Sequence, residues 1–234
     1  MDEIIAAPSP NFDARAAPVT MLVLHYTGMA DAASAIAWLR NPASQVSSHY
    51  VVAEDGQVLR LVDEADRAWH AGRGSWRDVP ADINSASVGI EIVNPGHEFG
   101  YRPFPDAQMR SVIALSTAIV ERHGIEPANV VGHSDIAPTR KVDPGELFDW
   151  EALAKRGLAV PRPARATMDP MWTDGGFLLA LNRYGYDVTD GPAAVRAFQR
   201  RFRPERVDGV ICGQTRAILL SLLLDRERGS ARPA

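Results

Sequence analysis

The chain places His133, Lys141 and Asp143 within eleven residues of one glycine- and proline-rich segment. His133 follows the short apolar run 130–132, which predicts a strand, so its ring should leave a rigid edge. Asp143 precedes Pro144, which biases its backbone toward the extended region. In an extended chain Lys141 and Asp143 project to the same side. An imidazole beside a fixed cation and anion indicates a hydrolytic centre, although a surface ion pair beside an unrelated histidine would give the same pattern.

A second histidine ends another apolar run. His25 closes the strand-like segment 21–25, so both histidines lie at strand ends, where α/β enzymes usually place their chemistry. Catalytic zinc sites use three nitrogen or oxygen ligands from the protein and leave a fourth position for water. His25, His133 and Asp143 supply that set and predict Zn2+ as the cofactor. Their long spacing lacks the compact signature of a zinc finger or of a His-Glu-x-x-His helix.

A carboxylate in a third apolar segment could supply a base. The apolar residues of 87–94 occupy one face of the expected strand, whereas Glu91 lies on the other face beside Gly89. A glycine there would let another group approach the backbone. A carboxylate in so apolar a strand is costly unless it is paired or used. Glu91 is therefore a candidate base, and a solvated residue on an edge strand is the alternative.

Five motifs follow one another in a recognisable order. They are His25-Tyr26-Thr27, Ser48-His49-Tyr50-Val51-Val52, Trp69-His70-Ala71-Gly72, Val88-Gly89-Ile90-Glu91-Ile92 and Gly132-His133-Ser134-Asp135 through Asp143-Pro144-Gly145. Together, over about residues 18–157, they resemble the zinc-dependent N-acetylmuramoyl-L-alanine amidases of the second type. That superfamily also contains phage lysozyme-amidases and peptidoglycan-recognition proteins. The resemblance implies zinc ligation by His25, His133 and Asp143, with Glu91 and Lys141 as the catalytic glutamate and lysine.

The resemblance also implies a reaction. The bond cut would be the amide between the lactyl carboxyl of N-acetylmuramic acid and L-alanine of the stem peptide. We expect recycled 1,6-anhydro-muropeptides as the substrate, and wall fragments with ordinary muramic acid are the alternative. Glu91 would take a proton from water and pass it to the leaving amine, while Lys141 would stabilise the negative carbonyl oxygen. A muropeptide or peptidoglycan is the implied partner, in recycling or turnover of the wall. The alternative is a peptidoglycan-recognition protein that binds without hydrolysis.

The loop 69–74 combines aromatic and basic side chains with glycines. That mixture suits stacking on a sugar face and bidentate pairing of an arginine with a peptide carboxylate. We therefore expect His70 and Arg73 to contact substrate, together with Trp69 and Tyr26.

The other histidines are weaker candidates. His49 lies in a strand that leads into a hairpin with its turn at Asp55-Gly56, where a buried hydrogen-bonding role is more common than metal ligation. His97 and His123 are expected to be structural or solvated.

Composition limits the possible partners. A chain of 234 residues with 46% hydrophobic content can bury one full core and a small second one. The net charge of −4 argues against a nucleic-acid partner. A single cysteine, Cys212, permits no internal disulfide. The sequence has no apolar run of about 18 residues, so we expect no membrane partner. We also expect a monomer.

The first twenty residues lack the basic start and continuous apolar core of a secretory signal. This predicts a cytoplasmic protein, or a periplasmic one if an export signal has been trimmed away. The cytoplasmic expectation contrasts with the resembling family, whose wall-binding members are commonly exported.

The chain divides into two regions of different pattern. Strands at about 20–25, 49–53, 57–62, 87–93 and 130–132, with helices at 31–40 and 106–123, predict an α/β fold with a mixed central sheet flanked by helices. We assign residues 1–157 to a zinc amidase catalytic domain and 158–169 to a proline- and alanine-rich linker. Residues 170–228 would form a small all-α domain.

Three amphipathic segments, at 176–184, 192–202 and 214–224, make up this last region. The Ala197-Phe198-Gln199 helix and the Asp208-Gly209 turn resemble the three-helix peptidoglycan-binding domain, over about residues 170–225. The alternative is a helical cap that stabilises the catalytic domain.

Overall fold

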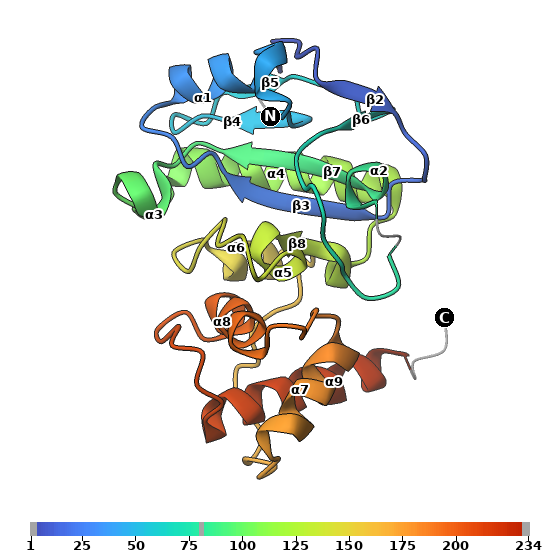
Figure 1. Cartoon of the computed structure of the whole chain (residues 1–234), viewed down its shortest axis with the longest axis vertical. Coiled ribbons are helices and arrows are strands. Elements are labelled where there is room, and N and C mark those ends of the chain that lie inside the picture. Colours follow the sequence, from blue (N-terminus) through green and yellow to red (C-terminus); the bar gives the residue numbers. More distant parts are fainter. Residues whose placement is uncertain (1–3, 80–81, 231–234) are drawn as a thin grey trace.

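The computed structural model describes residues 4–79 and 82–230 (Figure 1). The strands are β1 (Ile5–Ala6), β2 (Phe12–Ala14), β3 (Met21–Tyr26), β4 (Tyr50–Val52), β5 (Val58–Arg60), β6 (Asp66–Ala68), β7 (Ser87–Ile92) and β8 (Val130–Gly132). The α-helices are α1 (Ala32–Leu39), α2 (Ile83–Ala86), α3 (Gly96–Phe99), α4 (Asp106–His123), α5 (His133–Ile136), α6 (Trp150–Ala154), α7 (Asp174–Tyr184), α8 (Gly191–Phe202) and α9 (Gly213–Ser230), with 3-10 turns η1 (Pro42–Ser44) and η2 (Pro127–Asn129). Residues 1–3, which begin the segment expected to lack an export signal, lie outside the described part.

A six-stranded sheet in the order β1-β5-β4-β7-β3-β8 forms the centre of the fold. All neighbouring pairs are parallel except β4 with β5, which are joined as the expected antiparallel hairpin. The sheet is therefore mixed, as predicted. A second small sheet pairs β2 with β6.

The longest predicted helix of the sheet region has the expected bounds. α4 begins after Pro105 and ends at Gly124, whose φ of 63° is the left-handed conformation that glycine adopts most readily. Asp31 caps α1 by accepting a hydrogen bond from the Ser34 N–H. The sequence patterns did not predict the short elements β1, β2, β6, α2, α3, α5 and α6.

Two helical layers cover the sheet, and the C-terminal helices lie beyond its β8 edge (Figure 1). Alternate residues of β7 pack with α4 in one core, which contains Val88, Ile90 and Val112. A second core combines residues of β3 and β8 with aromatic residues of the C-terminal helices, including Phe177 and Phe198. The C-terminal helices therefore share a hydrophobic core with the sheet. Among the described residues, no helix is both long and apolar enough to cross a membrane.

Glu64 ties the end of α4 to the sheet. It accepts hydrogen bonds from the Tyr50 hydroxyl at 2.7 Å and from the Arg122 guanidinium at 2.6 Å, and His123 Nε2 lies 2.5 Å away. Burial opposes ionisation of this carboxyl, but the hydrogen bonds from His123, Tyr50 and Arg122 outweigh it and lower the pKa of Glu64. His123 is thus structural, as expected.

We predict that Glu64→Gln lowers the free energy of unfolding at neutral pH by about 2 kcal/mol, because charge-assisted hydrogen bonds are lost. A carboxyl whose pKa is lower when folded stabilises the protein above its usual value of 4.5 and loses that effect as pH falls through the folded-state pKa. Urea unfolding at several pH values should therefore show the difference between the two proteins shrinking in acid. The account would be contradicted if the difference in free energy of unfolding between wild type and Glu64→Gln stayed constant at pH values below the pKa of Glu64 in both the folded and the unfolded state.

Candidate active site

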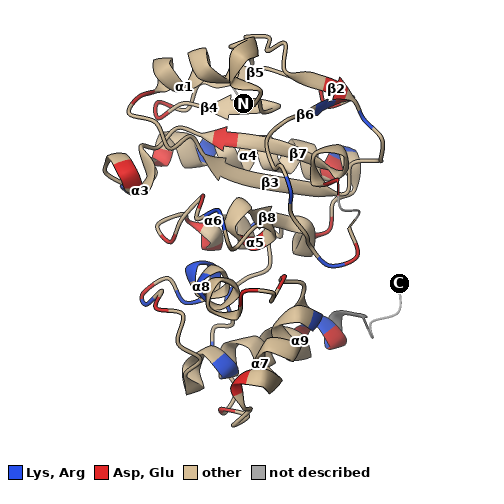
Figure 2. Ribbon diagram, viewed as in Figure 1, with Lys and Arg blue, Asp and Glu red and all other residues tan. Residues whose placement is uncertain are grey.

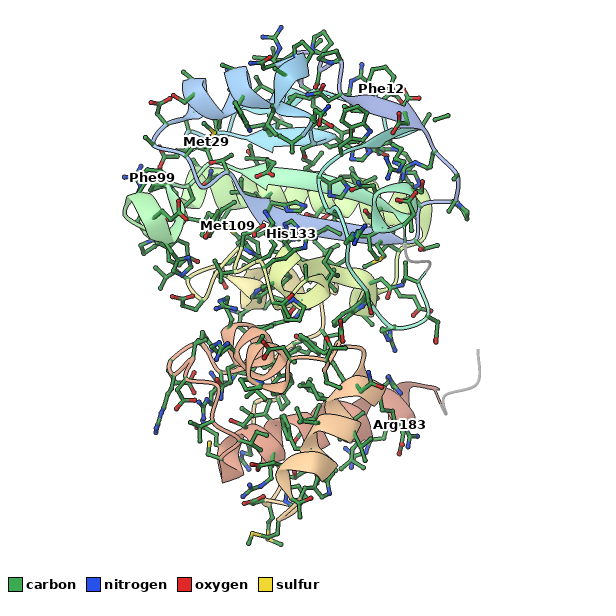
Figure 3. The ribbon with its side chains drawn as sticks, viewed as in Figure 1. Phe12, Met29, Phe99, Met109, His133 and Arg183 are labelled. Atoms are coloured by element: carbon green, nitrogen blue, oxygen red, sulfur yellow. The ribbon has the colours of Figure 1, made fainter. Side chains whose placement is uncertain are left out.

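Four segments bring the predicted site residues together at the carboxyl ends of the parallel strands. β3 and β7 are parallel, with His25 opposite Glu91, and β8 runs beside β3 and ends directly before His133. Figure 2 shows the acidic residue of β7 near the head of its arrow, and Figure 3 labels His133, the first residue of α5, next to β3. The loop after α5 returns to this edge, where the Ser134 N–H donates to the Asp143 carbonyl at 2.9 Å. The carboxyl ends of parallel strands thus gather the site.

His25, His133 and Asp143 converge on a single point. The two Nδ1 atoms are 2.9 Å apart, and each lies 3.1 Å from Oδ2 of Asp143. All three side chains are buried. Their candidate ligand atoms lie within 4.8 Å of one another, and they form the one such cluster of histidine, cysteine or acidic residues found in the described parts of the chain.

The hydrogen bond of His133 fixes its tautomer. Its Nε2 lies 2.9 Å from the carbonyl oxygen of Ala71. A carbonyl only accepts, so the proton resides on Nε2 and the Nδ1 lone pair is free. That lone pair faces the Asp143 carboxylate.

A relay of three side chains fixes the tautomer of His25. The Ser87 hydroxyl donates to the Ile83 carbonyl at 2.5 Å and therefore accepts from His70 Nε2 at 3.2 Å. His70 Nδ1 must then accept from His25 Nε2, at 3.0 Å. The Nδ1 of His25 is thus also unprotonated. Gly89 makes room for the relay, since a Cβ there would lie 2.5 Å from the His70 ring.

The electrostatic environment favours neutral histidines and an ionised Asp143. Burial, reinforced by His133, lowers the pKa of His25 to about 4, and burial likewise lowers the pKa of His70. Burial opposes ionisation of Asp143, but His133 and His25 outweigh it and lower the pKa of that carboxyl. The two unprotonated Nδ1 atoms and the Asp143 carboxylate oxygen lie 2.9 to 3.1 Å from one another. They repel one another unless a cation lies among them. The donor set therefore fits a divalent metal ion of the zinc type.

Glu91 lies beside this cluster, on the strand next to His25. β7 is a central strand between β4 and β3, so the solvated-edge interpretation does not hold. Its Oε2 is buried and has no hydrogen-bond partner among the described residues. Burial, together with the charge of Asp143, raises the pKa of Glu91 well above its usual value, although Lys141 acts in the opposite direction. A carboxyl with a raised pKa is suited to exchanging a proton during a reaction.

A cleft of about 450 Å³ opens over these residues. The predicted site residues that line it are Tyr26, Trp69, His70, Glu91, His133, Lys141 and Asp143. Lys141 and Asp143 both line this cleft, from a loop between α5 and α6. Arg73 is exposed and does not line it.

Arg140 is a cleft residue that the sequence patterns missed. Its guanidinium donates to the carbonyl of Ala71 at 2.5 Å and to the carbonyl of Arg73. It therefore holds the carbonyl on which the tautomer of His133 depends. A basic residue directly before Lys141 was the available signal, but nothing in the sequence showed that it folds back onto the loop 69–74.

The predicted aromatic contacts are held rigidly at the cleft. The Trp69 indole N–H donates to the Asp13 carboxylate at 2.6 Å, from strand β2. The Tyr26 hydroxyl lies 3.0 Å from Nδ1 of His97, whose Nε2 is 3.2 Å from Glu146. His97 thus supports the cleft wall, whereas it was expected to be structural or solvated. His49, as expected, is a buried hydrogen-bonding residue, accepting from the Gly89 N–H at 2.9 Å.

Known proteins of similar sequence and structure identify the family of this chain. A family model described as N-acetylmuramoyl-L-alanine amidase matches residues 15–146. The N-acetylmuramoyl-L-alanine amidase AmiD of Escherichia coli (strain K12) is 38% identical, over 88% of this chain and 82% of its own length. A structure of that amidase in complex with the substrate anhydro-N-acetylmuramic acid-L-Ala-D-gamma-Glu-L-Lys has a TM-score of 0.79 and 37% identity, covering 91% of this chain and 92% of its own. AmpDh3 from Pseudomonas aeruginosa, in complex with anhydromuramic pentapeptide, has a TM-score of 0.78 and 32% identity, covering 89% and 92%.

The fold and the buried polar cluster are those of a hydrolase built on a mixed sheet. The chain belongs to the N-acetylmuramoyl-L-alanine amidase family. It is an enzyme that hydrolyses the amide between N-acetylmuramic acid and L-alanine of the stem peptide. The alternative of a peptidoglycan-recognition protein without activity is therefore set aside.

Proposed function

We propose that this amidase binds one zinc ion through His25, His133 and Asp143 and uses it to cut anhydro-muramoyl peptides. The observation that carries the metal proposal is the set of two unprotonated Nδ1 atoms and one carboxylate oxygen aimed at a common point. A bound zinc would supply Lewis-acid activation of the attacking water and of the scissile carbonyl. Three protein ligands leave room in a tetrahedral shell for such a group.

Glu91 is the proposed proton carrier. Its Oε2, which has no hydrogen-bond partner within residues 4–79 and 82–230, and its raised pKa suit a carboxylate that accepts a proton from water and then passes it to the nitrogen of L-alanine as the amide breaks. Lys141, which also lines the cleft, would donate a hydrogen bond to the carbonyl oxygen as negative charge develops there. Tyr26 and Trp69 would bind the sugar or stem peptide along the cleft walls.

His70 has a different proposed role from the one expected. Both of its ring nitrogens are engaged by His25 and Ser87. That arrangement leaves no ring nitrogen free for substrate, so we propose that His70 orients His25. Arg73 is the least supported of the expected substrate contacts, since it lies away from the cleft.

The anhydro form is the proposed substrate because two similar enzymes are solved in complex with anhydro-muramoyl peptides. A muropeptide as ligand agrees with the polar, aromatic-walled cleft. We propose that the C-terminal helices add affinity for peptidoglycan, as their resemblance to the peptidoglycan-binding domain implies. The cytoplasmic location, the monomeric state and the absence of a nucleic-acid partner remain predictions from the sequence.

The substrate proposal is tested by assaying purified enzyme side by side on soluble anhydro-muropeptides and on intact sacculi. We expect release of stem peptide from soluble anhydro fragments to be at least about tenfold faster, because a small ligand enters the cleft without ordering a wall polymer. Zinc content should be measured on the same samples. Equal or faster release from sacculi would contradict the substrate assignment, and activity that survives complete removal of metal would contradict the zinc site.

A further inference from the structure

β8 is the edge strand of the main sheet, and α8 lies beyond that edge (Figure 1). The basic positions of α8 are blue in Figure 2. One of them, Arg201, donates through NH2 to the carbonyl of Val130 at 3.1 Å. An arginine from the C-terminal region thus donates a hydrogen bond to the backbone of the edge strand. This strand leads directly into His133.

Arg201 also reaches the helix that carries His133. Its NH1 lies 3.0 Å from Oδ2 of Asp135, the third residue of α5. The same oxygen accepts from the Gly132 N–H at 2.8 Å, and Oδ1 accepts from the Tyr186 hydroxyl at 2.6 Å. The side chains of Arg201 and Asp135 are only 4% and 1% exposed. Asp135 therefore holds the first turn of α5, and two residues of the C-terminal region hold Asp135.

The Arg201 guanidinium also contacts the segment that follows Asp143. It lies over the ring of Trp150, 4.0 Å from the centroid, at the start of α6. A Cβ at Gly132 would lie 2.7 Å from Pro144, the neighbour of Asp143, so β8 and the ligand loop are packed tightly together. Arg201 is in contact with the chain on both sides of the loop 133–143.

We propose that Arg201 is a positioning residue for the metal site, acting through Asp135 on the backbone from which His133 projects. The inference rests on the proposed metal site and goes beyond it. It makes the C-terminal helices part of the catalytic unit, in addition to any role they have in binding peptidoglycan. Loss of Arg201 would let the first turn of α5 shift, and the His133 Nδ1 would no longer point at the position shared with His25 and Asp143.

A matched control is available two residues away. Arg203 is also fully buried, but within the described part of the chain its guanidinium hydrogen-bonds to residues of its own region: Arg206, Asp208 and Cys212. Arg201→Met and Arg203→Met therefore each remove one buried guanidinium from the C-terminal region, and only the first removes contacts to α5 and β8. The measurement is the Kd for zinc, by competition with a chromophoric chelator, at a temperature where circular dichroism shows the full-length proteins folded.

We expect Arg201→Met to weaken zinc binding about tenfold, as loss of supporting residues around metal ligands typically does. Arg203→Met should leave the zinc Kd within about twofold of wild type even where it lowers Tm as much. Tyr186→Phe removes only the hydroxyl on Asp135 and should give a smaller weakening. If Arg201→Met does not fold, the zinc Kd of Tyr186→Phe alone tests the proposal.

Two results would overturn the proposal. One is a wild-type zinc Kd in folded Arg201→Met, or in Tyr186→Phe if the former is unfolded. The other is equal weakening by Arg201→Met and Arg203→Met, which would indicate general destabilisation. A wild-type protein that binds no zinc would instead refute the proposed metal site, so the two failures can be told apart.

Discussion

We expect Glu91→Gln to abolish most amide hydrolysis and to leave the proposed zinc ion bound. Glutamine keeps the size and shape of the side chain but cannot accept a proton, so we expect kcat to fall by about 10²–10⁴-fold. The three proposed ligands do not include Glu91, and its Oε2 has no partner among the described residues. Zinc stoichiometry should therefore stay at that of the wild type. The measurement is stem-peptide release from a muropeptide, with metal content determined on the same preparation.

A carboxylate outside the cleft provides the control. Glu121 is exposed on α4, and Glu121→Gln makes the same chemical change there. This variant should retain wild-type turnover and metal content. Full hydrolysis by metal-loaded Glu91→Gln would show that another group carries the proton.

His133→Ala and Asp143→Ala should lose both metal and activity. Each removes one of three buried ligand atoms that lie at 2.9 to 3.1 Å from one another. Two remaining ligands bind zinc far more weakly than three, so we expect the zinc Kd to rise at least about 100-fold. Hydrolysis should fall to background at zinc concentrations that saturate the wild type.

His123→Ala is the matched histidine control, since His123 lies against Glu64 at the end of α4 and outside the cluster. It should lower thermal stability and keep wild-type zinc affinity. If His133→Ala bound zinc as tightly as the wild type, the ion would have to be held elsewhere.

Sequence patterns predicted the parts of the fold that periodicity and capping determine. The bounds of α4 follow from its apolar stripe between Pro105 and Gly124, and the β4–β5 hairpin follows from the Asp55-Gly56 turn. His25, Glu91 and His133 were identifiable because each lies at or near the end of an apolar strand. Asp143 and Lys141 were identifiable because their residue types complete that chemistry.

What the sequence could not predict are contacts between segments that are distant in the chain. β1 and β2 are two and three residues long and are stabilised by pairing with β5 and β6, so no local pattern marks them. The sequence predicts His70 as a substrate contact in a glycine-rich loop, but Gly89 lets its ring pack on β7 and hydrogen-bond to His25. The shared core of sheet and C-terminal helices depends on burial that composition alone does not reveal.

The most direct measurement is diffraction from zinc-soaked crystals of the wild-type protein, with data collected on both sides of the zinc absorption edge. One anomalous peak should lie about 2.0–2.2 Å from Nδ1 of His25, Nδ1 of His133 and a carboxylate oxygen of Asp143. An active crystal whose only zinc peak lies away from these three side chains would contradict the account.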